Sequence, residues 1–286
     1  MKIAGVQMDV SFANPEVNLQ RMQTFLREAG SAGASLVAFP ECALTGYCFE
    51  SLEEARPVAQ AIPGPATEAM AAACREAGCF AIFGMLEASG DDVFNAAVLV
   101  GPEGVVASYR KVHMPFLGID RFASYGDRPF AVHEAGDVRL GMLICYDGAF
   151  PEAPRCLALQ GADLIVLPTN WPPGAECLAE SSIATRAMEN AIYFMAVNRV
   201  GIERGVNFIG RSSICGPQGK VLAVGSASSE EILYADIDVS AARQKQIVRV
   251  PGKHIIDRIA DRRPEMYGPV VEPHDLPRPR DLVQGD

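Results

Sequence analysis

One cysteine follows a predicted buried strand and comes just before a predicted helix. The strand is the apolar run Val138–Ile144, Cys145 follows it, and a turn signal at Asp147-Gly148 precedes a Pro-Glu helix start. A cysteine in this place has a fixed backbone and free N–H groups nearby, which suits a thiolate nucleophile and an oxyanion. Most cysteines pack in the core as small hydrophobic residues, so core packing is the alternative for this one.

A glutamate and a lysine occupy the same kind of position. Glu41 follows the predicted strand Ser35–Phe39, where partial burial raises the pKa of a carboxylate and suits it to general-base catalysis. Lys111 follows the predicted strand Gly104–Tyr109, where a fixed cation would stabilise a thiolate and then an oxyanion. The alternatives are a turn cap or an arginine pair for Glu41 and a solvated side chain for Lys111. In open α/β sheets, sites assemble at such strand ends.

The three residues lie in motifs that resemble those of the nitrilase superfamily of carbon–nitrogen hydrolases. The motifs are P-E-x-x-L-T-G-Y around Glu41, Y-R-K-x-H around Lys111 and C-Y-D-x-x-F-P-E from Cys145. Runs at 186–190, 198–201 and 262–267 also resemble family patterns, so the likeness extends from Met1 to about Tyr267. The resemblance implies a four-layer αββα sandwich with mixed sheets, and catalysis by these three side chains.

The resemblance also implies a reaction cycle that needs no metal or organic cofactor. Glu41 takes the proton of Cys145, the thiolate attacks an amide carbonyl, and ammonia leaves to give a thioester that water hydrolyses. Lys111 and the backbone N–H of Tyr146 hold the oxyanion. The family's second glutamate is missing, and Asp120 is the nearest carboxylate, so it is the candidate auxiliary carboxylate. Pairing with the adjacent arginine or capping a turn is its alternative role.

Four further residues are candidates for a substrate pocket: Tyr47, His113, Asn170 and Trp171. The last two follow the predicted strand Asp163–Leu167, at the sheet edge that carries Cys145. Trp171 is the only tryptophan in the chain, and simple packing is its alternative. His113 leaves open a papain-like pairing with Cys145, although orienting the loop is the role we expect for it.

The residues after the nucleophile favour one branch of chemistry. Cys145-Tyr146-Asp147 resembles the amidase branches more than the nitrilase branch, so we expect hydrolysis of a small carboxamide to a carboxylic acid and ammonia. Hydrolysis of N-carbamoyl amines or of nitriles on the same site stays open, and a non-catalytic scaffold on the same fold is the remote alternative. The sequence has no G-x-S-x-G elbow, P-loop or dinucleotide-binding glycine motif.

Composition narrows the class of protein. The net charge of −10 over 286 residues argues against nucleic acid or an anionic membrane surface as a partner. Four histidines and eight scattered cysteines without a CxxC pair argue against a zinc site. No apolar run reaches the ~18–20 residues of a membrane span. Without a secretion signal we expect a cytoplasmic protein with reduced thiols, and the resemblance implies a homodimer or higher homo-oligomer.

Strand and helix signals alternate along the chain, and no linker of biased composition divides it. We therefore expect one domain over 1–286, with an extended tail from about residue 251 that wraps a surface or a partner subunit. The expected helices are Pro15–Gly30, Thr67–Ala77, Ala153–Gln160, Glu176–Asn190 and Val239–Gln246. The expected strands, besides those named above, are Lys2–Met8, Cys79–Met85, Val93–Val100, Ala191–Asn198, Phe208–Gly216, Lys220–Val224 and Ile232–Asp238.

Overall fold

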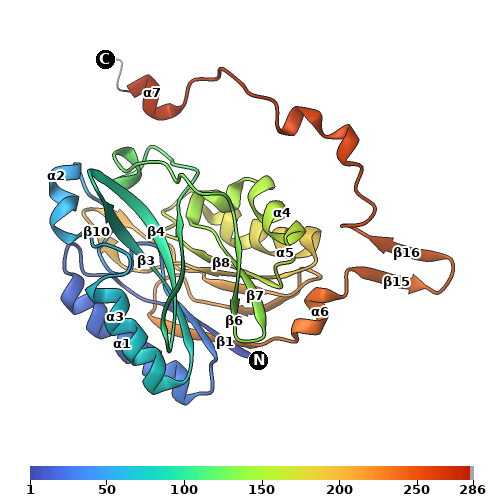
Figure 1. Ribbon diagram of the computed structural model, residues 1–286, viewed down its shortest axis with the longest axis horizontal. Coiled ribbons are helices and arrows are strands. Elements are labelled where there is room, and N and C mark those ends of the chain that lie inside the picture. Colours follow the sequence, from blue (N-terminus) through green and yellow to red (C-terminus); the bar gives the residue numbers. More distant parts are fainter. Residues whose placement is uncertain (284–286) are drawn as a thin grey trace.

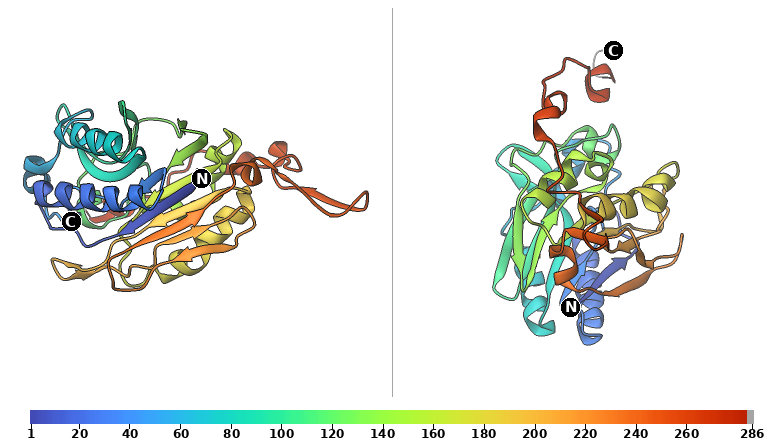
Figure 2. Two further views of the ribbon diagram at one scale, coloured as in Figure 1. Left: turned by 90° about the horizontal axis from the view of Figure 1, so that it is seen from below. Right: turned by 90° about the vertical axis from the view of Figure 1, so that its right-hand side faces the viewer.

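The computed structural model describes residues 1–283 and has four layers, with two β-sheets face to face and helices outside each sheet (Figure 1 and Figure 2). This arrangement confirms the predicted αββα sandwich. Apolar side chains fill the space between the sheets; Ile82 of one sheet and Leu140 and Ile165 of the other belong to one buried cluster. A second buried cluster joins the outer face of the first sheet to its helices. Because both faces of each sheet are covered, the strand ends are where polar groups can gather.

The first sheet is mixed. Its three central strands β1, β2 and β3 are parallel, and the flanking strands pair antiparallel. Helices α1 (Pro15–Ser31) and α3 (Pro65–Ala77) cover its outer face. The strand order is β14 (Glu231–Asp236), β1 (Lys2–Gln7), β2 (Leu36–Ala38), β3 (Phe80–Ser89), β4 (Asp92–Gly101) and β5 (Gly104–Arg110).

The second sheet repeats the first sheet's series of parallel and antiparallel pairs. Its parallel strands are β7, β8 and β9, so β7 and β8 take the places that β1 and β2 have in the first sheet. Helices α4 (Glu152–Leu159) and α5 (Ile183–Asn190) cover its outer face. The strand order is β6 (Val132–Ala135), β7 (Val138–Met142), β8 (Leu164–Pro168), β9 (Tyr193–Val197), β12 (Ser213–Cys215) and β13 (Val221–Val224).

The segment through β2 shows how the sequence specifies the layers. Leu36 and Ala38 belong to the core between the sheets, whereas Val37 and Phe39 belong to the core under the helices. Successive side chains of a strand point to opposite faces, so a strand buried on both faces is apolar at every position. The strand ends where the chain reaches Pro40 and Glu41, which brings the first polar side chain to the sheet edge.

Local signals fix the ends of the outer helices. The Asn14 side chain accepts a hydrogen bond from the Val17 N–H, and Pro15 occupies the first turn of α1, as predicted. Helix α3 ends at Gly78, which has a φ of 66° in the left-handed region that favours glycine.

The remaining elements lie in connections and in the tail. Figure 1 shows the chain leaving the body after α6 as a projecting hairpin, β15–β16, and then running back along the molecule to α7. No helix of the described residues is long and apolar enough to cross a membrane. The short elements are α2 (Leu52–Ala55), β10 (Ile202–Glu203), β11 (Val206–Asn207), α6 (Val239–Arg243), β15 (Gln246–Val250), β16 (His254–Asp257) and α7 (Pro279–Val283).

The structure corrects one predicted strand and confirms a predicted helix that contains a π turn. The expected strand Phe208–Gly216 is a strand only at β12, because Gly210 and Arg211 both have a φ of 58° and turn the chain. The expected helix Glu176–Asn190 is confirmed: Glu176 and Cys177 are α-helical, Leu178–Ser182 form a wider π turn, and α5 continues to Asn190. The hairpin β15–β16 was not expected, since its strands pack on no apolar core that a sequence pattern would show.

The turn that carries Glu41 packs directly on β3 at Gly84. The Gly84 N–H donates to the Pro40 carbonyl and the Gly84 carbonyl accepts from the Leu44 N–H, both at 3.1 Å. A Cβ added at Gly84 would lie 2.3 Å from the backbone nitrogen of Cys42. Only glycine therefore fits at this close approach.

We predict that Gly84→Ala lowers the free energy of unfolding by about 1–3 kcal/mol, because the added methyl group overpacks the turn. Urea denaturation followed by circular dichroism measures this change. Gly268→Ala is the matched control, since a Cβ there meets no atom within 4 Å. Equal stability of the two variants would contradict the close approach.

Candidate active site

The three reactive residues predicted from the sequence meet at one edge of the sandwich. Glu41 lies in the turn after β2, and Lys111 directly follows β5, which runs in the same direction as β2. Cys145 lies in the turn after β7 of the second sheet. The charges of Glu41 and Lys111 both act on the Cys145 thiol, so the three groups share one site.

Lys111 is a fully buried ammonium group held between two carboxylates. Its Nζ donates to Glu41 Oε1 at 2.7 Å and to Asp120 Oδ2 at 2.5 Å, and all three side chains are inaccessible to solvent. The short helical turn Gly118–Arg121 carries Asp120 into this position. The neighbouring Arg121 side chain bonds backbone carbonyl groups instead, so Asp120 pairs with Lys111.

The carboxylates keep Lys111 charged. Burial by itself disfavours the ammonium form, but Asp120 and Glu41 outweigh it and hold the pKa of Lys111 well above its ordinary value. Burial raises the pKa of Glu41, with Lys111 opposing this shift and the negative charge of Asp120 adding to it. The site therefore combines a permanent cation with a carboxylate that binds a proton more readily than one in water.

Asn95 of β4 completes this network, and sequence reasoning missed it. Its Nδ2 donates to Glu41 Oε1 at 2.8 Å and to Asp120 Oδ1 at 2.9 Å. The signal in the sequence is a buried amide within the otherwise apolar run of β4. Tyr47, predicted as a pocket residue, donates its hydroxyl to Asp120 Oδ2 at 2.8 Å and is fully buried. Both residues therefore orient the carboxylates that hold Lys111.

The two oxygens of Glu41 have different surroundings. Oε1 accepts from both Lys111 and Asn95. Oε2 is buried, and within residues 1–283 it has no hydrogen-bond partner. A buried carboxylate oxygen left without a donor is an open position for a proton.

Cys145 lies in a strained turn. Its φ of 44° is in the left-handed region, which is rare for a residue with a side chain and clusters at functional sites. Burial raises the pKa of the Cys145 thiol to about 12; the Glu41 charge adds to this shift, while Lys111, the Thr169 side chain and the Asn170 backbone oppose it. The thiol is therefore protonated at neutral pH, and its reaction as a nucleophile requires a base.

Asp147 holds the turn of Cys145 in place. Its carboxylate accepts from the backbone N–H groups of Ile144 at 2.9 Å and His113 at 3.0 Å, and from the Tyr109 hydroxyl at 2.8 Å. His113 Nδ1 lies 2.7 Å from the same carboxylate, and the His113 ring stacks on Phe150. The structure thus places His113 against Asp147, as expected for a residue that orients the loop.

The turn after β8 offers polar atoms with no partner. Thr169 Oγ1, both amide atoms of Asn170 and Trp171 Nε1 are buried without a hydrogen-bond partner in the described chain. Thr169 and Asn170 adjoin the Cys145 thiol. The backbone N–H of Trp171 donates to Asn198 Oδ1 at 2.8 Å, which ties this turn to the segment after β9. Unpaired buried polar groups are costly, so this cluster suits a polar ligand beside the thiol.

Comparison with known proteins decides the family. Residues 2–246 match the family model described as carbon-nitrogen hydrolase. The chain belongs to the carbon–nitrogen hydrolase family. It is 39% identical over 268 residues to a nitrilase from Pyrococcus abyssi, which covers 93% of this chain and 99% of that protein. It is 33% identical over 248 residues to an (R)-stereoselective amidase from Pseudomonas sp., with coverages of 85% and 88%.

Solved structures agree with this membership. An amidase from Nesterenkonia sp. AN1 matches with a TM-score of 0.77 and 26% identity, over 93% of this chain and 98% of that one. In a mutant of that amidase, acrylamide has undergone Michael addition at the active-site cysteine. The nitrilase-superfamily resemblance predicted from the motifs is confirmed, and this chain is an amidase-type carbon–nitrogen hydrolase.

A second buried ion pair in this carbon–nitrogen hydrolase supports the turn of Glu41. Glu203 Oε1 accepts from the backbone N–H groups of Tyr47 and Cys48 at 2.8 and 2.6 Å. Arg199 binds Glu203 Oε2 at 2.5 Å and Asp9 Oδ1 at 2.9 Å. The run at 198–201, which resembles a family pattern, therefore contributes an arginine whose ion pair with Glu203 stabilises the loop after β2.

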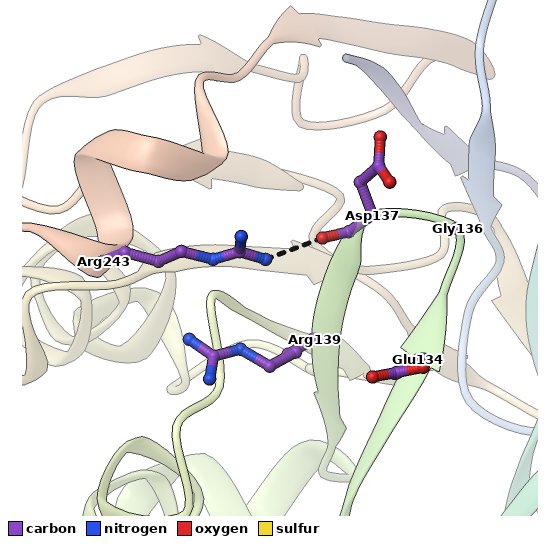
Figure 3. Close-up of a pocket in the computed structure, with 5 residues that line it drawn as sticks. All are labelled: Glu134, Gly136, Asp137, Arg139 and Arg243. Atoms are coloured by element: carbon purple, nitrogen blue, oxygen red, sulfur yellow. Dashed lines mark hydrogen bonds between the residues drawn. The ribbon is translucent and has the colours of Figure 1, made fainter.

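A polar cavity of about 470 Å³ at the other end of β7 is separate from this site (Figure 3). It is lined by Glu134, Gly136, Asp137, Arg139 and Arg243. Both arginines bind the buried Asp163, and Arg243 also donates to the Asp137 carbonyl at 2.7 Å. Both lining arginines are therefore committed to Asp163. No group of three or more metal-ligating side chains comes together within residues 1–283.

The charges around Cys145 predict opposite effects of two substitutions. Glu41→Gln removes a negative charge that raises the thiol pKa, so the pKa of Cys145 falls below that of the wild type. Lys111→Met removes the cation that opposes the shift, so the pKa rises further. Thiolate absorbance in the ultraviolet, followed during pH titration with Cys145→Ala subtracted, measures both. A lower thiol pKa in Lys111→Met would contradict this electrostatic account.

Proposed function

We propose that this enzyme hydrolyses the C–N bond of a small carboxamide to a carboxylic acid and ammonia through a thioester on Cys145. One observation carries the proposal: Glu41 binds Lys111 and Asn95 through Oε1, its Oε2 has no hydrogen-bond partner in the described chain, and its charge acts on the Cys145 thiol. A carboxylate with one oxygen anchored and the other open is suited to move protons. The raised pKa of Glu41 favours the same role.

The first half of the cycle transfers an acyl group to sulfur. Glu41 Oε2 takes the thiol proton as Sγ of Cys145 bonds to the amide carbon, and the carbonyl oxygen becomes an oxyanion. Glu41 then donates this proton to the amide nitrogen, the C–N bond breaks, and ammonia leaves. Throughout, the ammonium of Lys111 neutralises charge that moves from Glu41 to sulfur and then to oxygen.

The second half returns the enzyme to its starting state. Glu41 accepts a proton from water as the water oxygen attacks the thioester carbon. The C–S bond then breaks, the carboxylic acid leaves, and the proton passes from Glu41 to the Cys145 sulfur. Glu41 can act in both halves, because it gives up its proton at the end of each, first to the amide nitrogen and then to the Cys145 sulfur.

The oxyanion needs fixed donors. We assign Lys111 and the backbone N–H of Tyr146, which directly follows Cys145 in the turn before α4. One such donor typically contributes roughly 3–4 kcal/mol to lowering the barrier. Asp120 serves as the auxiliary carboxylate: it balances Lys111 while Glu41 carries the thiol proton.

The polar atoms beside Cys145 support a polar substrate. Asn170 offers a donor and an acceptor, and Trp171 offers a donor, and all of these atoms are buried and unpaired in the described chain. We assign these two residues to substrate binding. Tyr47 and His113 have positioning roles in this proposal, because their polar atoms bind Asp120 and Asp147.

Nitrile hydrolysis is the second candidate, because the Pyrococcus abyssi relative is named a nitrilase. The relatives named as amidases and the motif Cys145-Tyr146-Asp147 favour the carboxamide. N-carbamoyl amines would use the same acyl transfer to Cys145. None of these reactions draws on a metal or organic cofactor in the cycle above.

We also propose a single domain over 1–286 that acts in the cytoplasm as a homodimer or higher homo-oligomer. All eight cysteines are free thiols, which suits a reducing compartment. Exposed apolar side chains gather in the segment from β15 onward, which suits burial against another subunit. They are Val248, Val250, Ile255, Met266, Val270, Val271, Leu276, Leu282 and Val283.

Ammonia release from a panel of primary amides, N-carbamoyl compounds and nitriles tests the proposed reaction. We expect the fastest turnover with small primary amides. Intact-protein mass spectrometry after an acid quench should show an acyl adduct that maps to Cys145 and is absent from Cys145→Ala. Turnover confined to nitriles, or an adduct on Cys42 or Cys215, would contradict the proposal.

A further inference from the structure

At the end of the described tail, one side chain is withdrawn from solvent and hydrogen-bonded to the body. From Arg263 to Val283 every residue is exposed except Arg280, in α7. Figure 1 shows the tail returning over the molecule to bring α7 near the loop between β5 and β6. Because the rest of this segment is exposed, the hydrogen bonds of Arg280 to the body are informative.

Arg280 binds the turn that carries Asp120. Its Nη2 donates to the backbone carbonyl of Asp120 and to that of Ala123, the latter at 3.1 Å. These carbonyl groups lie at and just beyond the end of the short turn Gly118–Arg121, where helical carbonyls lack internal donors. A cation at this end of a turn is favourable, so Arg280 acts as its cap.

The ring of Tyr125 contacts two arginines of the tail at this point. The guanidinium groups of Arg278 and Arg280 lie 4.8 and 4.7 Å from the centre of the Tyr125 ring. Pro277 and Pro279 flank Arg278 and restrict the backbone, which lowers the entropy lost on docking. The two arginines therefore share the ring contact, but the bonds to the Asp120 turn belong to Arg280.

The opposite side of this turn faces the reaction centre. The Asp120 side chain accepts from Lys111, Asn95 and Tyr47, while its backbone carbonyl accepts from Arg280. We propose that Arg280 is a positioning residue, which holds the Asp120 carboxylate against Lys111 and so maintains the charge balance of the catalytic centre. This inference rests on the proposed function of that centre.

Arginine suits this task better than lysine. A planar guanidinium reaches two carbonyl groups and stacks on an aromatic ring at the same time, whereas an ammonium is a compact point charge. Arg280→Lys should therefore fall between the wild type and Arg280→Ala. A residue that merely filled space would not show this order.

We expect Arg280→Ala to lower kcat about tenfold with little change in KM, because a loosened turn misplaces catalytic groups more than substrate. Arg278→Ala is the matched control: it removes a guanidinium from the same ring but no bond to the turn. It should keep kcat within about twofold of the wild type. Circular dichroism and thermal unfolding confirm that both variants are folded.

The pH profile separates positioning from general stability. Glu41 is faced by Lys111, Asp120 and Asn95, and Lys111 by Glu41, Asp120, Tyr47 and Cys145. The negative charge of Asp120 raises the pKa of both Glu41 and Lys111, so its retreat lowers both. In Arg280→Ala both limbs of the kcat/KM profile should move to lower pH, and in Arg278→Ala neither should move.

Alkylation of Cys145 by iodoacetamide, followed by peptide mass spectrometry, gives a readout that needs no substrate. We expect Cys145 in Arg280→Ala to react several-fold more slowly than in Arg278→Ala, since a Lys111 ammonium no longer held in place by Asp120 stabilises the thiolate less. If this contrast holds while the wild type hydrolyses nothing in the substrate panel, the proposed function fails and the positioning role stands. Equal kcat, equal pH profiles and equal alkylation in the two variants would overturn the inference, as would a loss in Arg280→Ala explained wholly by unfolding.

Discussion

The site depends on one buried cation between two carboxylates. Removing an ion from water costs several kcal/mol, and only well-placed partners offset that cost. Lys111 meets this condition with Glu41 and Asp120 at hydrogen-bond distance, and Asn95 bridges the two acids from β4. If any of these groups moved away, the buried charges would lose their compensation. The ion pair therefore fixes the ends of three chain segments relative to one another.

The protonation state of the nucleophile depends on the same buried groups. Burial keeps the Cys145 thiol protonated, so it is not a standing thiolate open to oxidation at neutral pH. Glu41 has one oxygen committed to Lys111 and Asn95, and in the proposed cycle the other receives the thiol proton. The two sheets have matching topologies, and each contributes from the ends of its parallel strands: the acid from the first, the thiol and the polar turn at Asn170 from the second.

Strand-end positions were predictable because local pattern specifies them. An apolar strand buried on both faces, followed by a polar or reactive residue, located Glu41 and Cys145, and the end of the edge strand β5 located Lys111. The role of Asp120 as auxiliary carboxylate was one of two open alternatives, and its pairing with Lys111 was not foreseen. Eight residues lie between the two, and sequence spacing does not say which way a loop folds.

The supporting residues lay beyond sequence reasoning for a different reason. Asn95, Glu203 and Arg280 act through contacts across 54, 156 and 160 residues of chain. Their local sequence does not indicate those partners, because distant segments come together only in the folded sandwich. An amide inside an apolar strand was a visible anomaly, whereas an arginine in a proline-rich tail was not.

The protonation state of Lys111 tests the account most directly. Nuclear magnetic resonance of the side-chain nitrogen in protein labelled with ¹⁵N-lysine, with the signal assigned by its loss in Lys111→Met, follows this group through a pH titration. The account predicts an ammonium signal that persists above the ordinary lysine pKa, because Asp120 and Glu41 hold the charge. A neutral amine at neutral pH would contradict it, and with it the idea that a fixed cation organises the site.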